Sequence, residues 1–553
     1  MAAFSRTKKI VDLLLRTVGL MLLSMTAQAT IYVVDINGIG NPNGCFSLDS
    51  THNDISVALA AARIDATLGP HTIYICDGAY SEAGSLNITN DNLIGLTVQG
   101  ESLTNVVITG AAGADMFNVH RDGVTFTNFT TNSGRFAFET NATGTDITLD
   151  TVIINNTAND SVRLNANTVT LTDVTINNTG TTANHDGILA NATVDGAFTA
   201  TRLTINNSGG YCARLRGGEP DTLVTFTETV LTNCGRIGLR TEAAADKLTI
   251  DDITVNGTGD NHCLQVLGGD LASNGNVRIT NATLNDCGDA GNDAGLFLNV
   301  TGGDTGAMVD VSDITVNDSA GRGIYVNNAR AINGGIVTFD NLIVNTTNNA
   351  EGIYFNNSHY AQITDLIIFD AGTHGLYVSG GDFMAIGVDN LSDNTITNSG
   401  DDGIYLANNA NDNTFNKFVL TSNTDDAIYI NNSKRNVFTD IEIDQMNVGR
   451  DGVVLDNNAN DDDFNNVNVT NTIGDCVRVD DGNNMDYINS TLSNCAGYGF
   501  NASPAAETGL YLDNVDISDT RNHALYVGNY TAGNIRLFDV TVTNAGGYVP
   551  GPA

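Results

Sequence analysis

Apolar and polar residues alternate in short stretches along almost the whole chain. Examples are Leu248-Thr-Ile-Asp followed by Ile253-Thr-Val, and Val337-Thr-Phe-Asp followed by Leu342-Ile-Val. Alternation with a period of two residues is typical of a β-strand with one buried face, and none of these stretches is long enough for a helix. Asparagine, aspartate and glycine separate them, as turns require. The pattern predicts an all-β chain of many short strands.

A further strand motif recurs at a regular interval. It is Gly-Ile-Tyr-Val from Gly323, Gly-Ile-Tyr-Phe from Gly352 and Gly-Leu-Tyr-Val from Gly375. We call the first residue of the motif the anchor. Anchors stand at Ser161, Gly187, Cys212, Gly238, Cys263, Gly295, Gly323, Gly352, Gly375, Gly403, Ala427, Gly452, Cys476, Gly499 and Ala524. Their mean spacing is near 26 residues, and three short strands in a repeat of this size predict a parallel β-solenoid.

The repeat resembles the right-handed parallel β-helix proteins of the pectin-lyase-like superfamily over nearly the whole chain after its N-terminal segment. The Asn-rich segments 408–416 (Asn-Asn-Ala-Asn-Asp-Asn-Thr-Phe-Asn) and 431–438 (Asn-Asn-Ser-Lys-Arg-Asn-Val-Phe) carry the closest likeness. The resemblance implies a right-handed parallel β-helix, but not one activity, because this scaffold hosts many. The amphipathic pattern from Ile55 to Ile64 predicts a helix that caps the N-terminal end.

The N-terminal segment has the three parts of a cleavable signal peptide. Basic residues precede an apolar run from Val18 to Met25, and Ala27-Gln28-Ala29 follows. We expect cleavage after Ala29 and a secreted, surface or periplasmic protein. The apolar run is shorter than the roughly 20 residues that span a bilayer, and no other stretch predicts a transmembrane helix. The expected division is signal peptide 1–29, cap and first rungs 30–110, and β-helix 111–553.

Two further features bear on partners. The formal net charge of -39 excludes a nucleic-acid-binding surface, which needs clustered Lys and Arg. It is compatible with divalent cations, basic partners or neutral glycans.

At the C-terminal end the chain stops at Ala553, where a new rung would begin. An end-to-end or capping partner could cover that edge, Pro550 and Pro552 could blunt it, or the chain is a fragment.

The eight cysteines are expected to form disulfides, because a secreted chain folds in an oxidising compartment. Each anchor cysteine has a second cysteine one rung later, and the spacing between rungs suits a disulfide. The predicted pairs are Cys212–Cys234, Cys263–Cys287 and Cys476–Cys495, with Cys45–Cys76 in the cap. The alternative is a ladder of buried free thiols.

Two residues after the anchor, the side chain is expected to point outward. Five consecutive rungs carry tyrosine there: Tyr325, Tyr354, Tyr377, Tyr405 and Tyr429. One interpretation is an aromatic ladder that stabilises the sheet. The other is a surface on which sugar rings stack, and the two are compatible.

The position before the anchor forms a largely acidic column. It comprises Glu351, His374, Asp402, Asp426, Asp451 and Asp475. Aspartate here could stabilise a turn through its own backbone. Alternatively, Ca²⁺ could bind at Asp451 and Asp475, or at the turn formed by Asp461, Asp462 and Asp463, because calcium prefers carboxylate oxygens.

Paired carboxylates also suggest glycan chemistry, since glycosidases place two acids around one bond. Asp402 and Asp426 on neighbouring rungs are the candidate catalytic pair, and Gly400-Asp401-Asp402-Gly403 is similar to the Gly-Asp-Asp-Cys motif of polygalacturonases. The other motifs of that family have no convincing match. Because the candidate residues follow the repeat, we favour an adhesin-like or structural protein that binds extended glycans. A polysaccharide lyase, hydrolase or epimerase is the alternative.

Overall fold

A computed structural model describes residues 30–36, 51–65, 70–140, 145–191, 196–216, 222–242, 247–270, 276–301, 308–330, 336–387, 394–502, 509–528 and 534–546. The described residues form an all-β parallel β-solenoid, as the sequence predicts. They divide into two compact units, the first formed by Met1–Ala158 and Arg163–Thr175 and the second by Asn159–Val162 and Ile176–Ala553. No described helix is long and apolar enough to cross a membrane.

In the described part of the first unit, the ten-residue helix α2 (Ile55–Ile64) lies at the position that the sequence predicts. The Asp54 carboxylate caps it by accepting a hydrogen bond of 2.7 Å from the backbone N–H of Ser56, a typical N-cap. The apolar face of α2 is buried. The other elements of this unit are β1 (Ile31–Val34), β2 (Thr51–His52), β3 (Thr72–Ile75), β4 (Gly78–Glu82), β5 (Leu86–Ile88), η1 (Asp91–Leu93), β6 (Thr97–Gly100), β7 (Val106–Gly110), β8 (Phe117–Val119), β9 (Val124–Asn132), β10 (Phe138–Thr140) and β11 (Asp146–Asn155). β12 (Val162–Leu164) and β13 (Thr168–Thr179) contain residues of both units.

In the second unit, one series of strands carries or follows the anchors, and we call these the anchor strands. They are β14 (Ile188–Ala190), β17 (Ala213–Arg216), β19 (Leu239–Glu242), β21 (Leu264–Asp270), β23 (Ala294–Thr301), β25 (Arg322–Asn327), β27 (Ile353–Asn356), β29 (Leu376–Ser379), β32 (Ile404–Ala407), β34 (Ile428–Asn431), β36 (Val453–Asp456), β39 (Val477–Val479), β43 (Phe500–Ala502) and β46 (Leu525–Val527). Neighbouring anchor strands pair in parallel and in register, so that residues at the same place in the motif face each other across successive turns.

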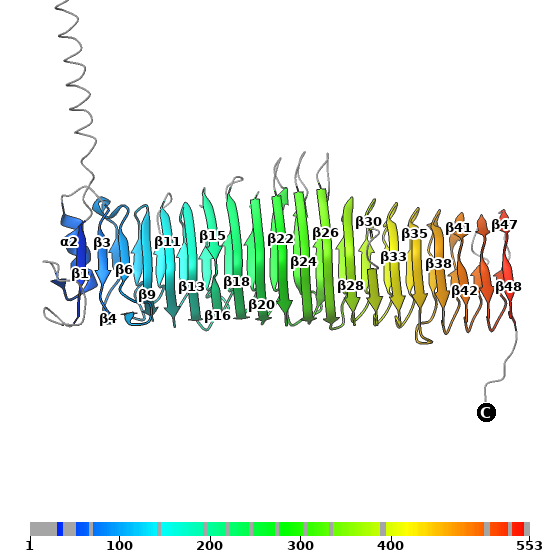
Figure 1. Cartoon of the computed structure of the whole chain (residues 1–553), viewed down its shortest axis with the longest axis horizontal. Helices are drawn as coiled ribbons and strands as arrows, with labels where there is room; N and C mark the ends of the chain where they lie inside the picture. The colour runs from blue at the N-terminus through cyan, green and yellow to red at the C-terminus, as the bar shows by residue number, and fades with distance from the viewer. Residues whose placement is uncertain are drawn as a thin grey trace, which may run out of the picture. The chain divides into compact units, whose positions relative to one another are not determined.

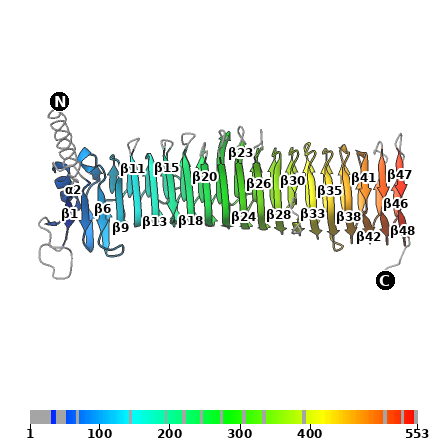
Figure 2. The same cartoon turned by 45° about the horizontal axis from the view of Figure 1, so that its top comes forward.

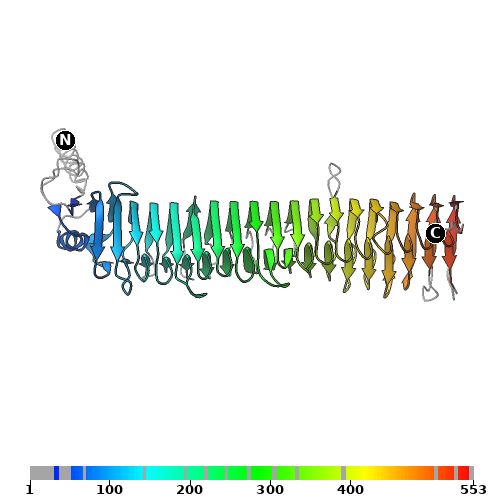
Figure 3. The same ribbon diagram turned by 90° about the horizontal axis from the view of Figure 1, so that it is seen from below.

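The remaining strands of this unit pair in parallel in the same manner. They are β15 (Ala197–Thr201), β16 (Thr204–Ser208), β18 (Leu223–Cys234), β20 (Lys247–Thr258), β22 (Asn276–Asn285), β24 (Met308–Ser319), β26 (Ile336–Thr347), β28 (Ala361–Phe369), β30 (Ala385–Ile386), β31 (Asn394–Thr397), β33 (Thr414–Thr421), β35 (Val437–Asp444), β38 (Asp463–Thr470), β41 (Met485–Ile488), β42 (Thr491–Ser493), β44 (Leu510–Asp513), β45 (Asp516–Ser518), β47 (Ile535–Phe538) and β48 (Thr541–Thr543), with the short pair β37 (Ala459–Asn460) and β40 (Gly482–Asn483). Figure 1 shows β18 to β26 side by side, and Figure 2 shows the same for β28 to β38. The view from below shows the strands of successive turns aligned through the green, yellow and red part of the chain (Figure 3).

The division of a turn into strands differs from the predicted three short pieces. In β20 the two predicted stretches form one continuous strand, with Asp252 between them at a φ of 56°. Asn281, Asp313 and Asn341 have positive φ at the same place in later turns. Asn and Asp adopt the left-handed conformation at lower cost than most residues, so the strand bends there without ending. Further along, β41 and β42 are separate strands, as predicted.

Close packing explains why most anchors are small. A Cβ atom added to Gly352 would lie 2.6 Å from the Ile368 side chain and 2.7 Å from the backbone oxygen of Gly375. Aromatic rings also stack inside the solenoid. Phe438 and Phe464 have ring centroids 5.0 Å apart, and Tyr487 continues this buried stack 4.3 Å from Phe464.

The Asn-rich segments supply a buried amide ladder. Asn436 Oδ1 accepts a hydrogen bond of 3.1 Å from the backbone N–H of Asn413, and Asp462 Oδ1 accepts one of 2.8 Å from the backbone N–H of Asn436. All three side chains are fully buried. Each acceptor therefore satisfies a backbone donor that would otherwise lose its partner inside the solenoid.

Three predicted cysteine pairs are joined in the structure. Cys212–Cys234, Cys263–Cys287 and Cys476–Cys495 have Cα atoms 5.3, 5.2 and 5.6 Å apart, as expected for residues one turn apart. Cys45 and the predicted signal peptide lie outside the described residues, so the Cys45–Cys76 pair and cleavage after Ala29 stay predictions.

Candidate functional site

The five tyrosines predicted to point outward form a continuous stack on β25, β27, β29, β32 and β34. Neighbouring ring centroids are 4.6 to 5.3 Å apart, and most of the ring pairs are nearly parallel. The stack comprises Tyr325, Tyr354, Tyr377, Tyr405 and Tyr429, all half-buried. Each inner ring has another ring on both faces, so sugars cannot stack on those faces. A glycan could contact only the ring edges and hydroxyls.

The tyrosine hydroxyls are partly engaged with neighbouring side chains. Tyr429 donates a hydrogen bond of 2.9 Å to Asp456, and Asn431 donates one of 3.3 Å to the hydroxyl of Tyr405. Burial raises the pKa of Tyr377 and Tyr405. The hydroxyls therefore stay protonated at neutral pH and can act as hydrogen-bond donors.

The acidic column forms a ladder that connects successive turns. Asp402 Oδ1 accepts a hydrogen bond of 3.1 Å from the backbone N–H of Asp426. Asp426 Oδ1 accepts one of 3.2 Å from Asp451, and Asp451 Oδ1 accepts one of 2.6 Å from Asp475. Asp475 in turn accepts one of 2.7 Å from the backbone N–H of Tyr498. These carboxylates thus bind the backbone of the next turn, rather than the turn that contains them.

Burial is the largest influence on the pKa values of the carboxylates in this acidic column. Burial, with smaller contributions from the neighbouring carboxylates Asp451, Asp402 and Asp425, raises the pKa of Asp426 to about 8. Arg450 lies 2.9 Å from Asp426 and 3.0 Å from Asp425, but its attraction does not cancel the cost of burial. Asp426 is therefore mostly protonated at neutral pH. The pKa values of Asp402 and Asp451 are also raised, first by burial.

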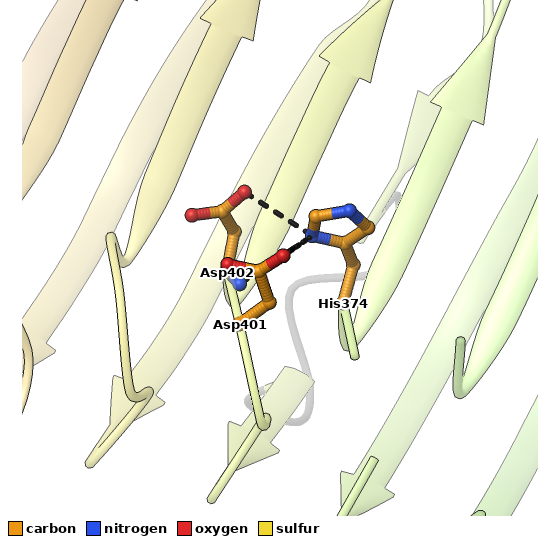
Figure 4. Close-up of side chains that lie close together, drawn as sticks. All are labelled: His374, Asp401 and Asp402. Carbon is orange, nitrogen blue, oxygen red and sulfur yellow. Dashed lines mark hydrogen bonds and ion pairs between the residues drawn. The ribbon is translucent and has the colours of Figure 1, made fainter. Parts of the chain in front are cut away.

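A histidine joins the ladder one turn before Asp402. Figure 4 shows His374 pointing toward Asp401 and Asp402. Its Nδ1 is 3.1 Å from Asp402 Oδ2 and 3.8 Å from Asp401 Oδ2, while the backbone N–H of Asp402 lies 3.4 Å from the same nitrogen. One nitrogen cannot both accept and donate, and the shorter contact favours Nδ1–H donating to the Asp402 carboxylate. The imidazole also packs against Tyr405, with ring centroids 4.5 Å apart.

The predicted catalytic pair lies in this cluster. Asp402, Asp425 and Asp426 bring oxygens within 4.8 Å of one another. However, Asp402 is only 3% exposed and Asp426 only 1%, and each holds a backbone N–H of the next turn. Both carboxylates are thus engaged with the backbone of the solenoid. The carboxylates of the cluster that face solvent belong to Asp401 and Asp425.

Among the described residues, those proposed for calcium belong to no group of three or more close ligand atoms. Asp475 accepts hydrogen bonds through both oxygens, the second from Asn501 at 2.8 Å, and Asp451 lies 3.2 Å from Arg478. In the turn at Asp461, that residue accepts a hydrogen bond of 3.0 Å from the exposed Asn484, Asp462 is fully buried, and Asp463 is exposed. Groups that could hold a cation are His374–Asp401–Asp402 and Asp402–Asp425–Asp426, and Arg450 already occupies the second.

A separate pair of stacked aromatic rings was not predicted from the sequence. Tyr360 and Phe383 lie just before β28 and β30, with ring centroids 5.0 Å apart and planes 7° apart. They are 52% and 48% exposed. Both have a φ of 58°, which is unfavourable for bulky side chains. The equivalent positions of later turns hold Asp412, Arg435, Asp461 and Asn484. A pattern search could have found the pair only by aligning turns at this corner.

Comparison with known proteins identifies the fold. The family model described as "Right handed beta helix region" matches residues 384–545. By sequence, no curated protein matches significantly. This match over part of the chain agrees with the parallel β-solenoid of the described residues and confirms the β-helix fold predicted from the repeat.

The solved structures that match this chain have low sequence identity to it. One is the catalytic domain of an α-1,3-glucanase in complex with nigerose, with 15% identity and a TM-score of 0.44, over 63% of this chain and 66% of that one. The chain thus spans just under two thirds of that domain. Tailspike protein 3 of bacteriophage CBA120 has 12% identity and a TM-score of 0.29, over 82% of this chain and 59% of that one. A mutant periplasmic alginate epimerase has 11% identity and a TM-score of 0.24, over 88% of both chains.

Proposed function

We propose that this β-helix is a secreted, adhesin-like or structural protein that binds an extended glycan along the turns containing Tyr360 and Phe383. The observation that carries the proposal is the exposed, stacked pair itself. Unlike the inner tyrosines of the stack on the anchor strands, these rings present about half of their surface to solvent. Tyr354 and Tyr377, which belong to the tyrosine stack, lie in the same two turns.

Two bulky aromatic side chains at this corner have an energetic cost. Exposed aromatic surface gains little from burial, and a left-handed backbone costs roughly 1–2 kcal/mol for a residue with a side chain. Because Asp412, Arg435 and Asp461 have the same left-handed backbone at the equivalent corner, the fold imposes this conformation, and what needs explaining is the choice of two large, exposed aromatic side chains there. Sugar rings have apolar C–H faces that pack on aromatic rings, while their hydroxyls bind polar groups. Asp382, which precedes Phe383 in the sequence, is partly exposed and could provide such a contact.

The test is binding of the purified mature chain to a panel of neutral and acidic polysaccharides. In the double variant Tyr360→Asn, Phe383→Asn the rings are lost, but asparagine tolerates the left-handed backbone, so stability should not fall. We expect affinity to drop at least about tenfold. The control is Asp412→Asn at the next equivalent corner, which should bind normally. Unchanged binding by the double variant would overturn the proposal.

The second candidate function is a polysaccharide lyase, hydrolase or epimerase. It is favoured by one observation, the partly exposed Asp401 and Asp425 beside the mostly protonated Asp426. Incubation with the same panel, with Ca²⁺ and then with a chelator, would test it through unsaturated products and new reducing ends. Cleavage lost in Asp401→Asn would support an enzyme. Binding without products from any substrate would leave a glycan-binding protein.

A further inference from the structure

Arginine residues gather at one place in this acidic chain. The chain has 24 Lys and Arg against 63 Asp and Glu, yet Arg214 and Arg240 face each other in register on β17 and β19. Adjacent like charges destabilise a sheet unless something compensates. Arg236 lies in the loop before β19 and joins them, and the exposed Arg216 ends β17.

A buried tyrosine organises the group. The guanidinium carbons of Arg214, Arg236 and Arg240 lie 4.7, 5.0 and 5.7 Å from the ring centroid of Tyr211. Arg240 also donates a hydrogen bond of 3.3 Å to the Tyr211 hydroxyl. Cation–π contacts of this kind hold the planar guanidinium groups in place. Their N–H donors are thus positioned before any ligand arrives.

Negative charge in the group is too small to neutralise it. Glu242 lies 2.5 Å from Arg214 and 2.9 Å from Arg240. In the described part of the chain, the guanidinium groups of Arg216 and Arg236 have no hydrogen-bond or ion-pair partner. Asp186 is buried, and burial raises its pKa to about 7, so it carries only part of a charge at neutral pH.

The next residue of the same outward column has an unsatisfied acceptor. Gln265 pairs with Arg240 across the sheet, is only 8% exposed, and has no hydrogen-bond partner for its Oε1 in the described residues. A buried acceptor without a partner is costly. Phe297 and then Tyr325 follow in the column, with ring centroids 4.9 Å apart. Donor arginines, an open acceptor and aromatic edges therefore lie in one line.

We propose that Arg214, Arg236 and Arg240 bind an anionic group, carboxylate or sulfate, carried on an acidic glycan, while Gln265 accepts a hydrogen bond from a sugar hydroxyl. This inference rests on the proposed glycan-binding function and names the ligand class. Guanidinium groups match the planar fork of a carboxylate. An acidic protein surface would satisfy the arginines, but it supplies few hydroxyl donors for Gln265 and no reason for the aromatic continuation.

Calorimetric titration of the full chain tests the inference with three ligands: an oligogalacturonate, its carboxyl-reduced neutral counterpart, and a sulfated dextran oligomer. We expect the anionic ligands to bind more tightly than the neutral one and to weaken with added salt. Arg236→Gln should weaken anionic binding about tenfold, as loss of a charge-assisted contact would. The control Arg278→Gln removes an exposed arginine of another strand and should have no effect. Glu242→Gln removes the competing carboxylate and should tighten anionic binding.

Preference for one anion would identify the group, carboxylate or sulfate. Equal affinity for the charged and neutral oligomers, or no effect of Arg236→Gln, would overturn the inference. Polyglutamate binding as tight as that of the anionic sugars, or self-association lost in Arg236→Gln, would also overturn it by assigning the arginines to a protein partner. The proposed function fails differently, because then the Tyr360→Asn, Phe383→Asn variant binds every glycan as the unmodified chain does.

Discussion

Replacing the buried Asp462 by asparagine should stabilise its turn, and increasingly so as the pH rises. Asp462 Oδ1 accepts hydrogen bonds of 2.8 and 3.1 Å from the backbone and the amide of Asn436. Its Oδ2 has no hydrogen-bond partner in the described residues. Asn413 and Asn436 occupy the equivalent positions in the two preceding turns. The introduced asparagine would keep the accepting oxygen and carry no ionisable group.

The size of this stability gain follows from the protonation of Asp462 in the folded and unfolded states. Burial raises the pKa of Asp462 to about 8, against about 3.9 for aspartate in an unfolded chain. Below pH 4 both states are protonated and the carboxyl has no pH-dependent cost. Between about pH 4 and 8 the Asp462 carboxyl ionises only in the unfolded state. The free energy of unfolding therefore falls by about 1.4 kcal/mol per pH unit. The penalty reaches an upper bound of about 5–6 kcal/mol at pH 8 and then stays constant.

Hydrogen exchange of the peptide covering β38 measures this effect locally, which suits a solenoid whose turns open separately. The opening free energy of Asp462→Asn minus that of the unmodified chain should be small at pH 5 and several kcal/mol larger at pH 8. Asp440→Asn, which removes an exposed carboxylate in the preceding turn, is the matched control and should show no such trend. A gain that does not grow between pH 5 and pH 8 would refute the argument.

Three other perturbations test separate parts of the structure. Tyr377→Ala removes ring contacts at 4.6 and 4.8 Å and should lower the free energy of local opening of β29 by about 1–3 kcal/mol, measured by hydrogen exchange. Tyr377→Phe should lower it little, and equal effects of the two variants would contradict a stabilising role for the tyrosine stack. Replacing Cys476 and Cys495 together by serine should lower stability by about 2–4 kcal/mol, and an unchanged melting temperature would contradict a stabilising role for this disulfide. Arg450→Met should lower stability strongly at pH 9, where Asp426 is ionised in the folded state, and little at pH 6, where Asp426 is mostly protonated. An equal loss of stability at both pH values, measured by chemical denaturation, would contradict the assigned protonation of Asp426.

Features that depend on the repeat could be predicted from the sequence. The anchors fix the register of the strands, and Tyr377 therefore faces Tyr354 and Tyr405 as expected. The same register places Cys212 beside Cys234. In each case the relevant partner lies one period away, so counting along the chain was sufficient.

Features that depend on the corners could not be predicted. Asp461, Asp462 and Asp463 are consecutive in sequence, yet Asp462 is fully buried and accepts hydrogen bonds from Asn436, whereas Asp463 is exposed. Tyr360 and Phe383 both stand eight residues after their anchors, Gly352 and Gly375, so the repeat itself aligns them, but the sequence does not show that both rings are exposed on a left-handed backbone. The carboxylate of Asp402 likewise binds a backbone N–H of the next turn, a choice that only the three-dimensional path of the chain determines.

Glycan binding along Tyr360 and Phe383 is tested most directly by a hydrogen-exchange footprint of the full chain with a bound glycan from the panel. If the glycan lies along the exposed aromatic pair, exchange should slow in the peptides that cover residues 353–361 and 376–385. The corresponding corner around Asp461 should exchange at its original rate. Protection confined to other turns, with unchanged exchange around Tyr360 and Phe383, would contradict the account.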